Sequence, residues 1–160
     1  MKIDTVEITI PEACNVIIGH THFIKSVEDL YETLAESGTA IQFGLAFCEA
    51  SGDRLVRSDG NDEKLIEHAE QEALKIGAGH TFIIFMKSGY PVNVLNRIKD
   101  VSEVCSVYTA TSNPVEVVYA DTQHGRAILG VADGMRPIGI EKPADKEKRR
   151  EFLRKIGYKR

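Results

Sequence analysis

Residues 41–48, IQFGLAFC, form a short segment in which both sets of alternating positions are largely apolar. Such a run is typical of a β-strand that is covered on both faces, because successive side chains of a strand point to opposite sides of the sheet. Residues 81–86, TFIIFM, have the same character. These two segments predict the central strands of a β-sheet.

Shorter segments on either side predict the rest of the sheet. Val6, Ile8 and Ile10 alternate with polar residues, and Pro11 ends that strand. Further strands are expected at residues 15–18, 54–57, 104–109, 115–120 and 127–131. Some neighbouring strands are joined by turns that are too short for a parallel crossover, so we expect a mixed β-sheet.

Three helices are expected between these strands. Ser26 is expected to cap the first, Asn61 to cap the second, which stops at Gly77, and Pro91 to begin the third. The alternation of strands and helices predicts a single-domain α/β protein with a mixed sheet and three to four helices. An α+β arrangement of the same elements stays open.

The C-terminal residues 142–160 are strongly basic. They carry nine Lys or Arg against three acidic residues, a balance of +6, whereas the rest of the chain stands at −10. Phe152, Leu153 and Ile156 fall on one helical face, so we expect a docked basic helix that belongs to the same domain as residues 1–141. An RNA- or phosphate-binding tail is the alternative, but no nucleic-acid motif accompanies the charge.

Composition narrows the class of protein further. No apolar run approaches the roughly 20 residues that cross a bilayer, and residues 1–7 do not resemble a signal peptide. We therefore expect a cytoplasmic protein with no membrane association. Cys14, Cys48 and Cys105 are far apart and lie in apolar segments, which predicts buried, reduced thiols.

Histidines are the first candidates for chemistry, because no Walker loop or complete GxGxxG motif occurs. His80 follows a helix and precedes a strand, a position that in a parallel sheet favours a structural role. His20 and His22 point to one side of a strand, but no further ligand at suitable spacing supports a metal site. His22 is a candidate nucleophile or base, since imidazole is largely neutral at pH 7.

Several polar residues are candidates for ligand binding. Asn93 and Asn96 share one face of the third helix and could read the edge of a base, or could be ordinary surface residues. Asn113 precedes a proline in a turn, which explains it without a ligand. Glu116 is less expected in a strand unless its face is wet.

Residues 121–134, DTQHGRAILGVADG, are the most suggestive segment. Gly125 and Arg126 offer backbone N–H groups and a guanidinium fork, both suited to phosphate oxygens. Asp133 could hold Mg²⁺ or simply cap its turn, and a plain β-hairpin is the alternative for the whole segment. Glu49, in the turn after residues 41–48, completes the set of candidate ligand-binding residues.

These stretches resemble the adenosine-specific kinase family. The resemblance spans residues 14–141 and is carried by GHTHFIKSVEDLYE, IQFGLAFCEASGDRLVRSDGND, GAGHTFIIF, YPVNVLNRIK, TSNPVEVVYADTQHGRAILGVADG and PIGIE. Members of the family are described as small α/β oligomers, trimeric in one example. They bind adenosine and AMP but not ADP or ATP, and carry a modified histidine interpreted as phosphohistidine.

The resemblance implies an adenosine- and AMP-binding protein that acts as an adenosine-specific kinase through a phosphohistidine. The matching histidines are His22 and His80, of which we slightly favour His22. A homotrimer is implied as well. Ala127 stands where the family pattern has glycine, a departure that could stiffen the loop beside Arg126. The alternative is a non-catalytic sensor or regulatory protein that binds the same ligands.

Overall fold

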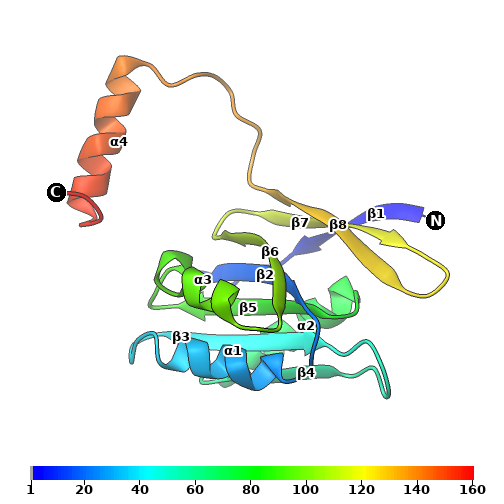
Figure 1. The fold of residues 1–160 in the computed structure, drawn as a ribbon. Helices are drawn as coiled ribbons and strands as arrows, with labels where there is room; N and C mark the ends of the chain where they lie inside the picture. Colours follow the sequence, from blue (N-terminus) through cyan, green and yellow to red (C-terminus); the bar gives the residue numbers. More distant parts are fainter. Residues whose placement is uncertain (1) are drawn as a thin grey trace.

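Two antiparallel sheets and four helices make up residues 2–160, which the computed structural model describes (Figure 1). In chain order the elements are β1 (Lys2–Ile8), β2 (Asn15–Thr21), α1 (Ser26–Ala35), β3 (Gln42–Cys48), β4 (Val56–Gly60), α2 (Glu63–Ile76), β5 (Thr81–Lys87), α3 (Pro91–Asp100), β6 (Val104–Thr111), β7 (Val115–Asp121), β8 (Arg126–Asp133) and α4 (Pro143–Lys155). The single-domain α+β form of the prediction is confirmed.

The larger sheet has the strand order β4-β3-β5-β2-β6, and the smaller sheet has the order β1-β7-β8. Every described strand pair is antiparallel, so the sheets are not mixed as the sequence suggested. Helices α1, α2 and α3 each connect two strands that run in the same direction, but an oppositely directed strand lies between them each time. Alternating helices and strands therefore produce no parallel pair here.

Both faces of the larger sheet are buried. On one face Phe43, Phe47 and Phe82 pack with apolar side chains of α1 and α3. On the other face Ile83 and Phe85 pack with α2 and with strands of the smaller sheet. The two alternating sets of β3 and β5 thus enter two separate cores, which explains why these segments are apolar throughout.

Two helix starts differ from the sequence expectation. Ser26 is the first residue of α1, but its hydroxyl contacts the preceding loop instead of capping the helix. Asp62, and not Asn61, caps α2. The Asn61 side chain accepts a hydrogen bond from the N–H of Phe43 at 2.8 Å and donates one to the carbonyl of Ile41 at 2.9 Å. Asn61 therefore fastens the start of β3, a contact between distant segments that local patterns do not reveal.

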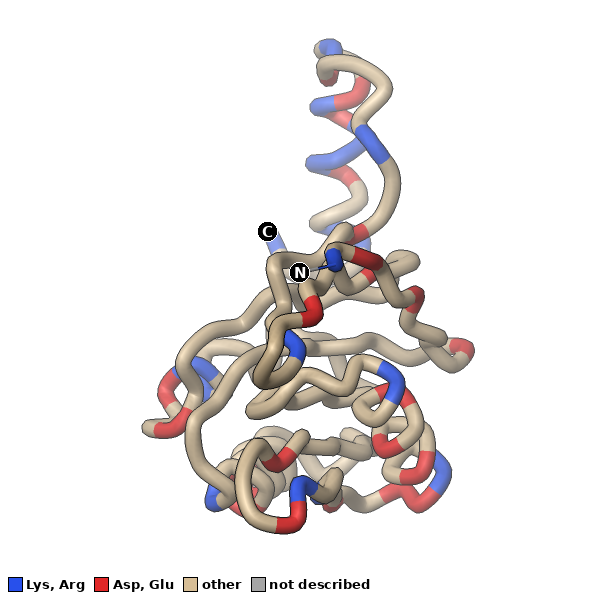
Figure 2. Tube along the Cα trace, turned by 90° about the vertical axis from the view of Figure 1, so that its right-hand side faces the viewer, with Lys and Arg blue, Asp and Glu red and all other residues tan. Residues whose placement is uncertain are grey.

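The C-terminal helix forms where the sequence predicts it, but it is not docked on its own chain. Residues 135–142 run without helix or strand, and α4 projects from the rest of the molecule at their end (Figure 1). None of the residues in α4 is buried. Figure 2 shows Lys, Arg, Asp and Glu distributed along this helix. The expected docking within one copy is therefore wrong.

Two further expectations concern the cysteines and the membrane. Cys14 and Cys48 are buried free thiols as predicted, whereas Cys105 is free but exposed on β6, an edge strand of the larger sheet. Burial raises the pKa of Cys48 to about 11. Among residues 2–160, none of the helices has the length and apolar character needed to cross a membrane.

The backbone of β3 at Gly44 lies close to the backbone of α2, and a substitution at Gly44 tests this packing. A Cβ atom at Gly44 would lie 2.1 Å from the carbonyl carbon of Leu65 and 2.2 Å from the nitrogen of Ile66. Because this helix backbone cannot move aside cheaply, we expect Gly44→Ala to lower the free energy of unfolding by about 3 kcal/mol or more, measured by urea denaturation. Gly130→Ala is the control, since no atom lies within 4 Å of its added Cβ. Equal stability losses in the two variants would contradict this packing.

Candidate functional site

The larger sheet brings three of the five histidines to the side where β2 ends and β5 begins. His20 and His22 lie at the end of β2, and His80 directly precedes β5. We call this group the histidine edge. In a parallel sheet the amino end of a strand lies away from the carboxyl ends of its neighbours. In this antiparallel sheet the amino end of β5 lies beside the carboxyl ends of β2 and β3. The position of His80 is therefore compatible with a site.

His80 has an unusual backbone conformation. Its φ of 62° lies in the left-handed region, which residues other than glycine rarely adopt. Its N–H donates to the carbonyl of Cys48 at 2.7 Å, and its carbonyl accepts from the N–H of Thr21 at 2.9 Å. The imidazole stacks on Phe47, with ring centroids 5.8 Å apart, and meets His20 edge-on at 6.2 Å. Strained residues fixed in this way are concentrated at functional sites.

The turn that carries His80 explains the sequence GAGH at residues 77–80. Gly77 ends α2 in the left-handed conformation, with φ 61°, and its N–H donates to the carbonyl of Ala73 at 2.9 Å. Gly79 lies against the loop between β3 and β4, because a Cβ at this position would be 2.9 Å from that of Ala50. The two glycines thus bring this loop next to His80.

A cavity of about 410 Å³ opens beside Gly79. Its walls come from the end of β3 and the following loop, the C-terminal end of α2, and the turn between β7 and β8. We call it the hairpin cavity; its lining includes Glu49, Arg54, Leu55, Leu74, Gly125 and Arg126. Three candidate residues from distant parts of the sequence, Glu49, Gly125 and Arg126, are therefore brought together here.

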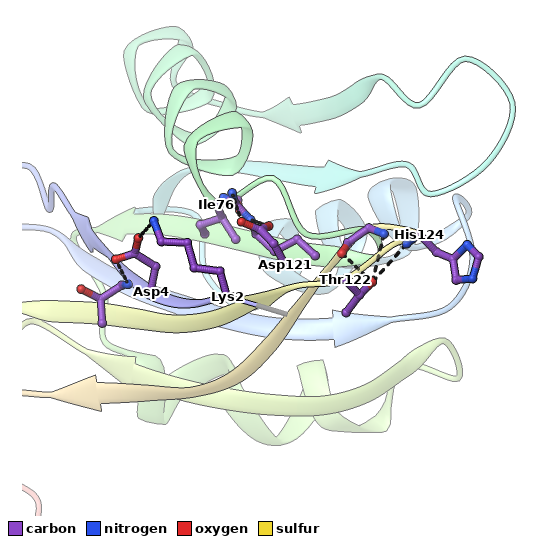
Figure 3. Close-up of polar contacts among 9 residues, drawn as sticks. Lys2, Asp4, Ile76, Asp121, Thr122 and His124 are labelled. Atoms are coloured by element: carbon purple, nitrogen blue, oxygen red, sulfur yellow. Dashed lines mark hydrogen bonds and ion pairs between the residues drawn. The ribbon is translucent and has the colours of Figure 1, made fainter.

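Arg126 is held by several partners within the chain. Its Nε donates to Asp121 at 2.8 Å, its Nη1 donates to the carbonyl of Ile76 at 2.9 Å, and its guanidinium lies 3.8 Å from the centre of the Tyr119 ring. Figure 3 shows Asp121 close to Ile76 at the end of α2. Arg126 thus fastens the smaller sheet to α2, and most of its hydrogen-bonding fork is occupied.

The backbone N–H groups of the same turn are also occupied. The hydroxyl of Thr122 accepts from the N–H groups of His124 and Gly125, at 3.3 and 3.2 Å, and donates to the carbonyl of Gly125 at 2.8 Å (Figure 3). These groups suggested a phosphate-binding loop in the sequence. In the folded chain the hydroxyl of Thr122 already accepts hydrogen bonds from these N–H groups. The turn is therefore closed by its own hydrogen bonds and does not present these groups to a phosphate.

The two candidate asparagines of α3 lie away from the hairpin cavity. The side chain of Asn93 accepts a hydrogen bond from the N–H of Tyr90 at 2.9 Å and so caps the helix. It borders a different cavity of about 280 Å³, together with Asn15. Asn96 is exposed. A capping role gives Asn93 an ordinary explanation, which the residue type alone did not distinguish from base recognition.

The candidates of the smaller sheet form a third group. Asp133 accepts from the hydroxyl of Thr109 at 2.6 Å and from Nδ2 of Asn113 at 3.1 Å. Burial raises the pKa of Asp133, but these hydrogen bonds outweigh it and hold the pKa below its ordinary value. Glu116 is exposed on β7, opposite Glu7 of β1. Among residues 2–160 no group of three or more potential His, Cys, Asp or Glu ligands is placed to hold a metal ion.

Arg57 is a candidate that sequence reasoning missed. It lies opposite Phe47 in the pairing of β3 with β4, so its side chain is on the face of the sheet where Phe47 packs. Its Nε is buried and has no hydrogen-bond partner among the described residues, an arrangement that costs about 1–3 kcal/mol. Arg57 also lines a cavity of about 550 Å³ with Phe23 and Lys25. In the sequence nothing distinguishes Arg57 from the exposed Arg54 nearby.

The buried carboxylate of Glu103 forms an ion pair near the histidine edge. Glu103 is buried and accepts from Nζ of Lys25 at 3.0 Å, while its second carboxylate oxygen has no partner within residues 2–160. Hydrogen bonds to Asp29 and Glu103 raise the pKa of Lys25 to about 12. The backbone carbonyl of Glu103 also accepts from the N–H of His22 at 3.1 Å. The end of β2 is therefore anchored to the loop before β6.

The fold and this edge define a small α+β protein with a constrained histidine directly after Gly79, which lines a cavity. Residues 6–159 match the model of the family described as adenosine specific kinase, and the chain belongs to this family. The crystal structure of the PH1918 protein from Pyrococcus horikoshii OT3 is similar, with a TM-score of 0.96 and 45% sequence identity over 99% of this chain and 98% of that chain. None of the curated proteins matches.

The proximity of His20 and His80 has a consequence that titration can test. Burial lowers the pKa of His20 below its ordinary 6.5, and the charge of His80 lowers it further. Because the unfolded chain then binds this proton more readily, the contribution of His20 to stability is complete above pH 6.5 and falls as the pH decreases. In a histidine NMR titration we expect His80→Gln to raise the pKa of His20 part of the way, since burial remains.

His124→Gln, in the exposed turn between β7 and β8, is the matched control and should leave the pKa of His20 unchanged. A His20 pKa at or above its ordinary value in the wild type would show that the two rings do not interact as described.

Proposed function

We propose that this protein binds adenosine and AMP and transfers a phosphoryl group to adenosine through a phosphohistidine. One observation carries the proposal: in a member of the adenosine specific kinase family, the strained His80 packs against His20 and Phe47 and directly follows Gly79, which lines the hairpin cavity. The combination supplies a constrained histidine one residue from the wall of a space of suitable size, at the same end of the sheet.

Adenosine occupies the hairpin cavity in this proposal. Its volume of about 410 Å³ falls in the range of small-molecule sites. Leu55 and Leu74 are more than half exposed and offer an apolar surface for the adenine ring. One carboxylate oxygen of Glu49 accepts from the N–H groups of Ala50 and Ser51, and the other is free to accept from the ribose hydroxyls.

The phosphoryl transfer takes place at the histidine edge. A nitrogen of His80 attacks the phosphorus of the donor, and the donor's leaving group departs with the electron pair of its bond to phosphorus. The 5′-hydroxyl of adenosine then attacks the phosphorus, the N–P bond breaks, and the proton passes to a neighbouring base. His20 suits this role because burial keeps its pKa low and its ring neutral. Arg57, across Phe47 from His80, is the uncommitted guanidinium for the transferring phosphate.

His80 replaces His22 as the favoured phosphoryl acceptor in this proposal. His22 is exposed and carries no constraint beyond its backbone hydrogen bond to Glu103. The free thiols fit a reducing, cytoplasmic compartment. We keep the homotrimer implied by the family resemblance as part of the proposal.

A non-catalytic adenosine or AMP sensor is the second candidate. The observation that favours it is the closed state of the β7–β8 turn, in which Arg126 and the turn N–H groups already have partners. A binding module needs no further groups at this turn, whereas a kinase needs charge neutralisation from elsewhere.

Phosphoryl transfer from the labelled protein separates the two candidates. After treatment with ³²P-phosphoramidate, a chemical phosphoryl donor, the wild type should form phosphohistidine and then labelled AMP when adenosine is added. We expect His80→Ala to lose both products while its affinity for adenosine, measured by calorimetry, changes less than about threefold. His22→Ala should retain both.

Loss of product in His22→Ala alone would make His22 the acceptor. A wild type that binds adenosine but never forms labelled AMP would leave the sensor as the function. No heat of binding with either adenosine or AMP would refute both candidates.

Glu49 gives a separate test of where the nucleoside binds. Its carboxylate is expected to accept from a ribose hydroxyl, a charged hydrogen bond worth about 1.5–3 kcal/mol. The wild type should therefore bind adenosine at least about tenfold more tightly than 2′,3′-dideoxyadenosine, and Glu49→Gln should remove most of this difference. Glu116→Gln, exposed on β7, is the control and should retain it. An unchanged preference in Glu49→Gln would place the ribose outside the hairpin cavity.

A further inference from the structure

A second cavity, of about 550 Å³, lies between the start of α1 and the edge strand β4. We call it the α1 cavity; its lining includes Phe23, Ile24, Lys25, Glu28, Arg57 and Asp59. Helix α1 packs over β3 and β4 at this place (Figure 1). The α1 cavity shares no lining residue with the hairpin cavity, so the two are separate spaces. Its volume falls in the range of small-molecule sites.

Arg57 is the one partly buried basic residue of residues 2–160 that forms no ion pair. The other two each have a carboxylate, since Lys87 contacts Asp62 at 2.8 Å and Arg126 contacts Asp121 at 2.8 Å. The Nε atom of Arg57 is buried and has no hydrogen-bond partner. A guanidinium does not lose its charge in a protein, so a shielded one is stabilised by an anion. In the α1 cavity that anion is absent from the chain and is supplied by a ligand.

The other charges of the α1 cavity limit how negative this ligand can be. Glu28 and Asp59 line the same space, and neither is ion-paired with Arg57. Lys25 adds positive charge, but its Nζ already contacts two carboxylates. Because Glu28 and Asp59 repel further negative charge, a triphosphate is disfavoured and a single phosphoryl group fits.

The remaining wall of the α1 cavity is apolar. Phe23 and Ile24 lie between β2 and α1 and are 50% and 41% exposed. A bare anion on Arg57 would leave these side chains in water, whereas a carbon group attached to the anion would cover them. The ligand that suits both walls is therefore a small organic molecule with one phosphoryl group.

Arg57 brings such a phosphoryl group close to the histidine edge. Phe47 pairs with Arg57 across β3 and β4, and it stacks on the ring of His80 with centroids 5.8 Å apart. Phe23 directly follows His22. The P–N bond of phosphohistidine is itself reactive, so it forms from donors whose leaving group is a stable anion, such as an acyl phosphate. The position of the α1 cavity thus suits a phosphoryl donor.

We propose that the α1 cavity binds the phosphoryl donor, a small acyl phosphate, with its phosphoryl group on Arg57 and its carbon part on Phe23 and Ile24. A nitrogen of His80 attacks the phosphorus, and the bond between phosphorus and the acyl oxygen breaks. The carboxylate departs with that electron pair, and the other ring nitrogen releases its proton to water. The donor role rests on the proposed function, whereas binding of the phosphoryl group by Arg57 does not.

Calorimetry with phenylphosphonate tests the site without catalysis, because its P–C bond holds no transferable phosphoryl group. The dissociation constant for the wild type should change less than about threefold when adenosine is saturating. Arg57→Met should weaken binding at least about tenfold, since a charged hydrogen bond is lost. Its midpoint of urea denaturation should not fall, because the Nε that it removes has no partner. Arg97→Met, exposed on α3, is the matched control and should keep the affinity.

Labelling with ³²P-acetyl phosphate tests the donor role. The wild type should form phosphohistidine, and phenylphosphonate should inhibit its formation. At a low concentration of acetyl phosphate, Arg57→Met should be labelled at least about tenfold more slowly than Arg97→Met. Phe23→Ser should reduce the preference for phenylphosphonate over methylphosphonate, because the phenyl ring loses its apolar contact.

The inference would be overturned by the absence of any heat with phenylphosphonate, by competition from adenosine, or by equal affinities in Arg57→Met and Arg97→Met. Labelled AMP that forms from acetyl phosphate at an unchanged rate in Arg57→Met would overturn it while the kinase chemistry stands. A protein that binds phenylphosphonate through Arg57 but never forms phosphohistidine would instead refute the proposed function, and the donor role with it.

Discussion

The antiparallel pairing of β3 with β5 is the constraint on which the rest of the structure depends. Residues Gln42 to Phe47 pair in register with Phe82 to Lys87, and nearly every side chain between them is buried. Because the side chains of a strand point alternately to opposite faces of the sheet, each face of this strand pair forms one wall of a different hydrophobic core. Helices α1 and α3 are required on one face, and α2 with the smaller sheet on the other.

The same constraint creates the candidate site. Antiparallel neighbours bring the end of one strand beside the beginning of the next, so loops from distant segments meet at one edge of the sheet. His80 is fixed between Cys48 at the end of β3 and Thr21 at the end of β2 by backbone hydrogen bonds. Its strained conformation is therefore maintained by the central sheet. A site built on such strand ends is positioned more rigidly than one on a free loop.

The sequence predicted the candidate site only in part. Glu49, Gly125 and Arg126 do share a cavity, since turn residues with polar side chains are concentrated at strand ends. Whether these groups are free to bind a ligand was not predictable. Arg126 already donates hydrogen bonds to Asp121 and to the carbonyl of Ile76, and the hydroxyl of Thr122 already accepts from the turn N–H groups. Arg57 was overlooked for the converse reason. A residue's type gives its hydrogen-bonding capacity, but only its neighbours in space determine whether that capacity is already used.

The sequence by itself determined the positions of most strands and helices, the two doubly buried central strands, the basic C-terminal helix and the family. These properties depend on local periodicity and on motifs contained within short segments. Only the tertiary structure decided that each helical connection passes over one strand of the sheet and that the ring of His80 contacts those of His20 and Phe47. It also decided that none of the residues in α4 is buried against the rest of its own chain. Periodicity records that a face is buried, but not which distant surface buries it, because that choice arises from the simultaneous packing of all the elements.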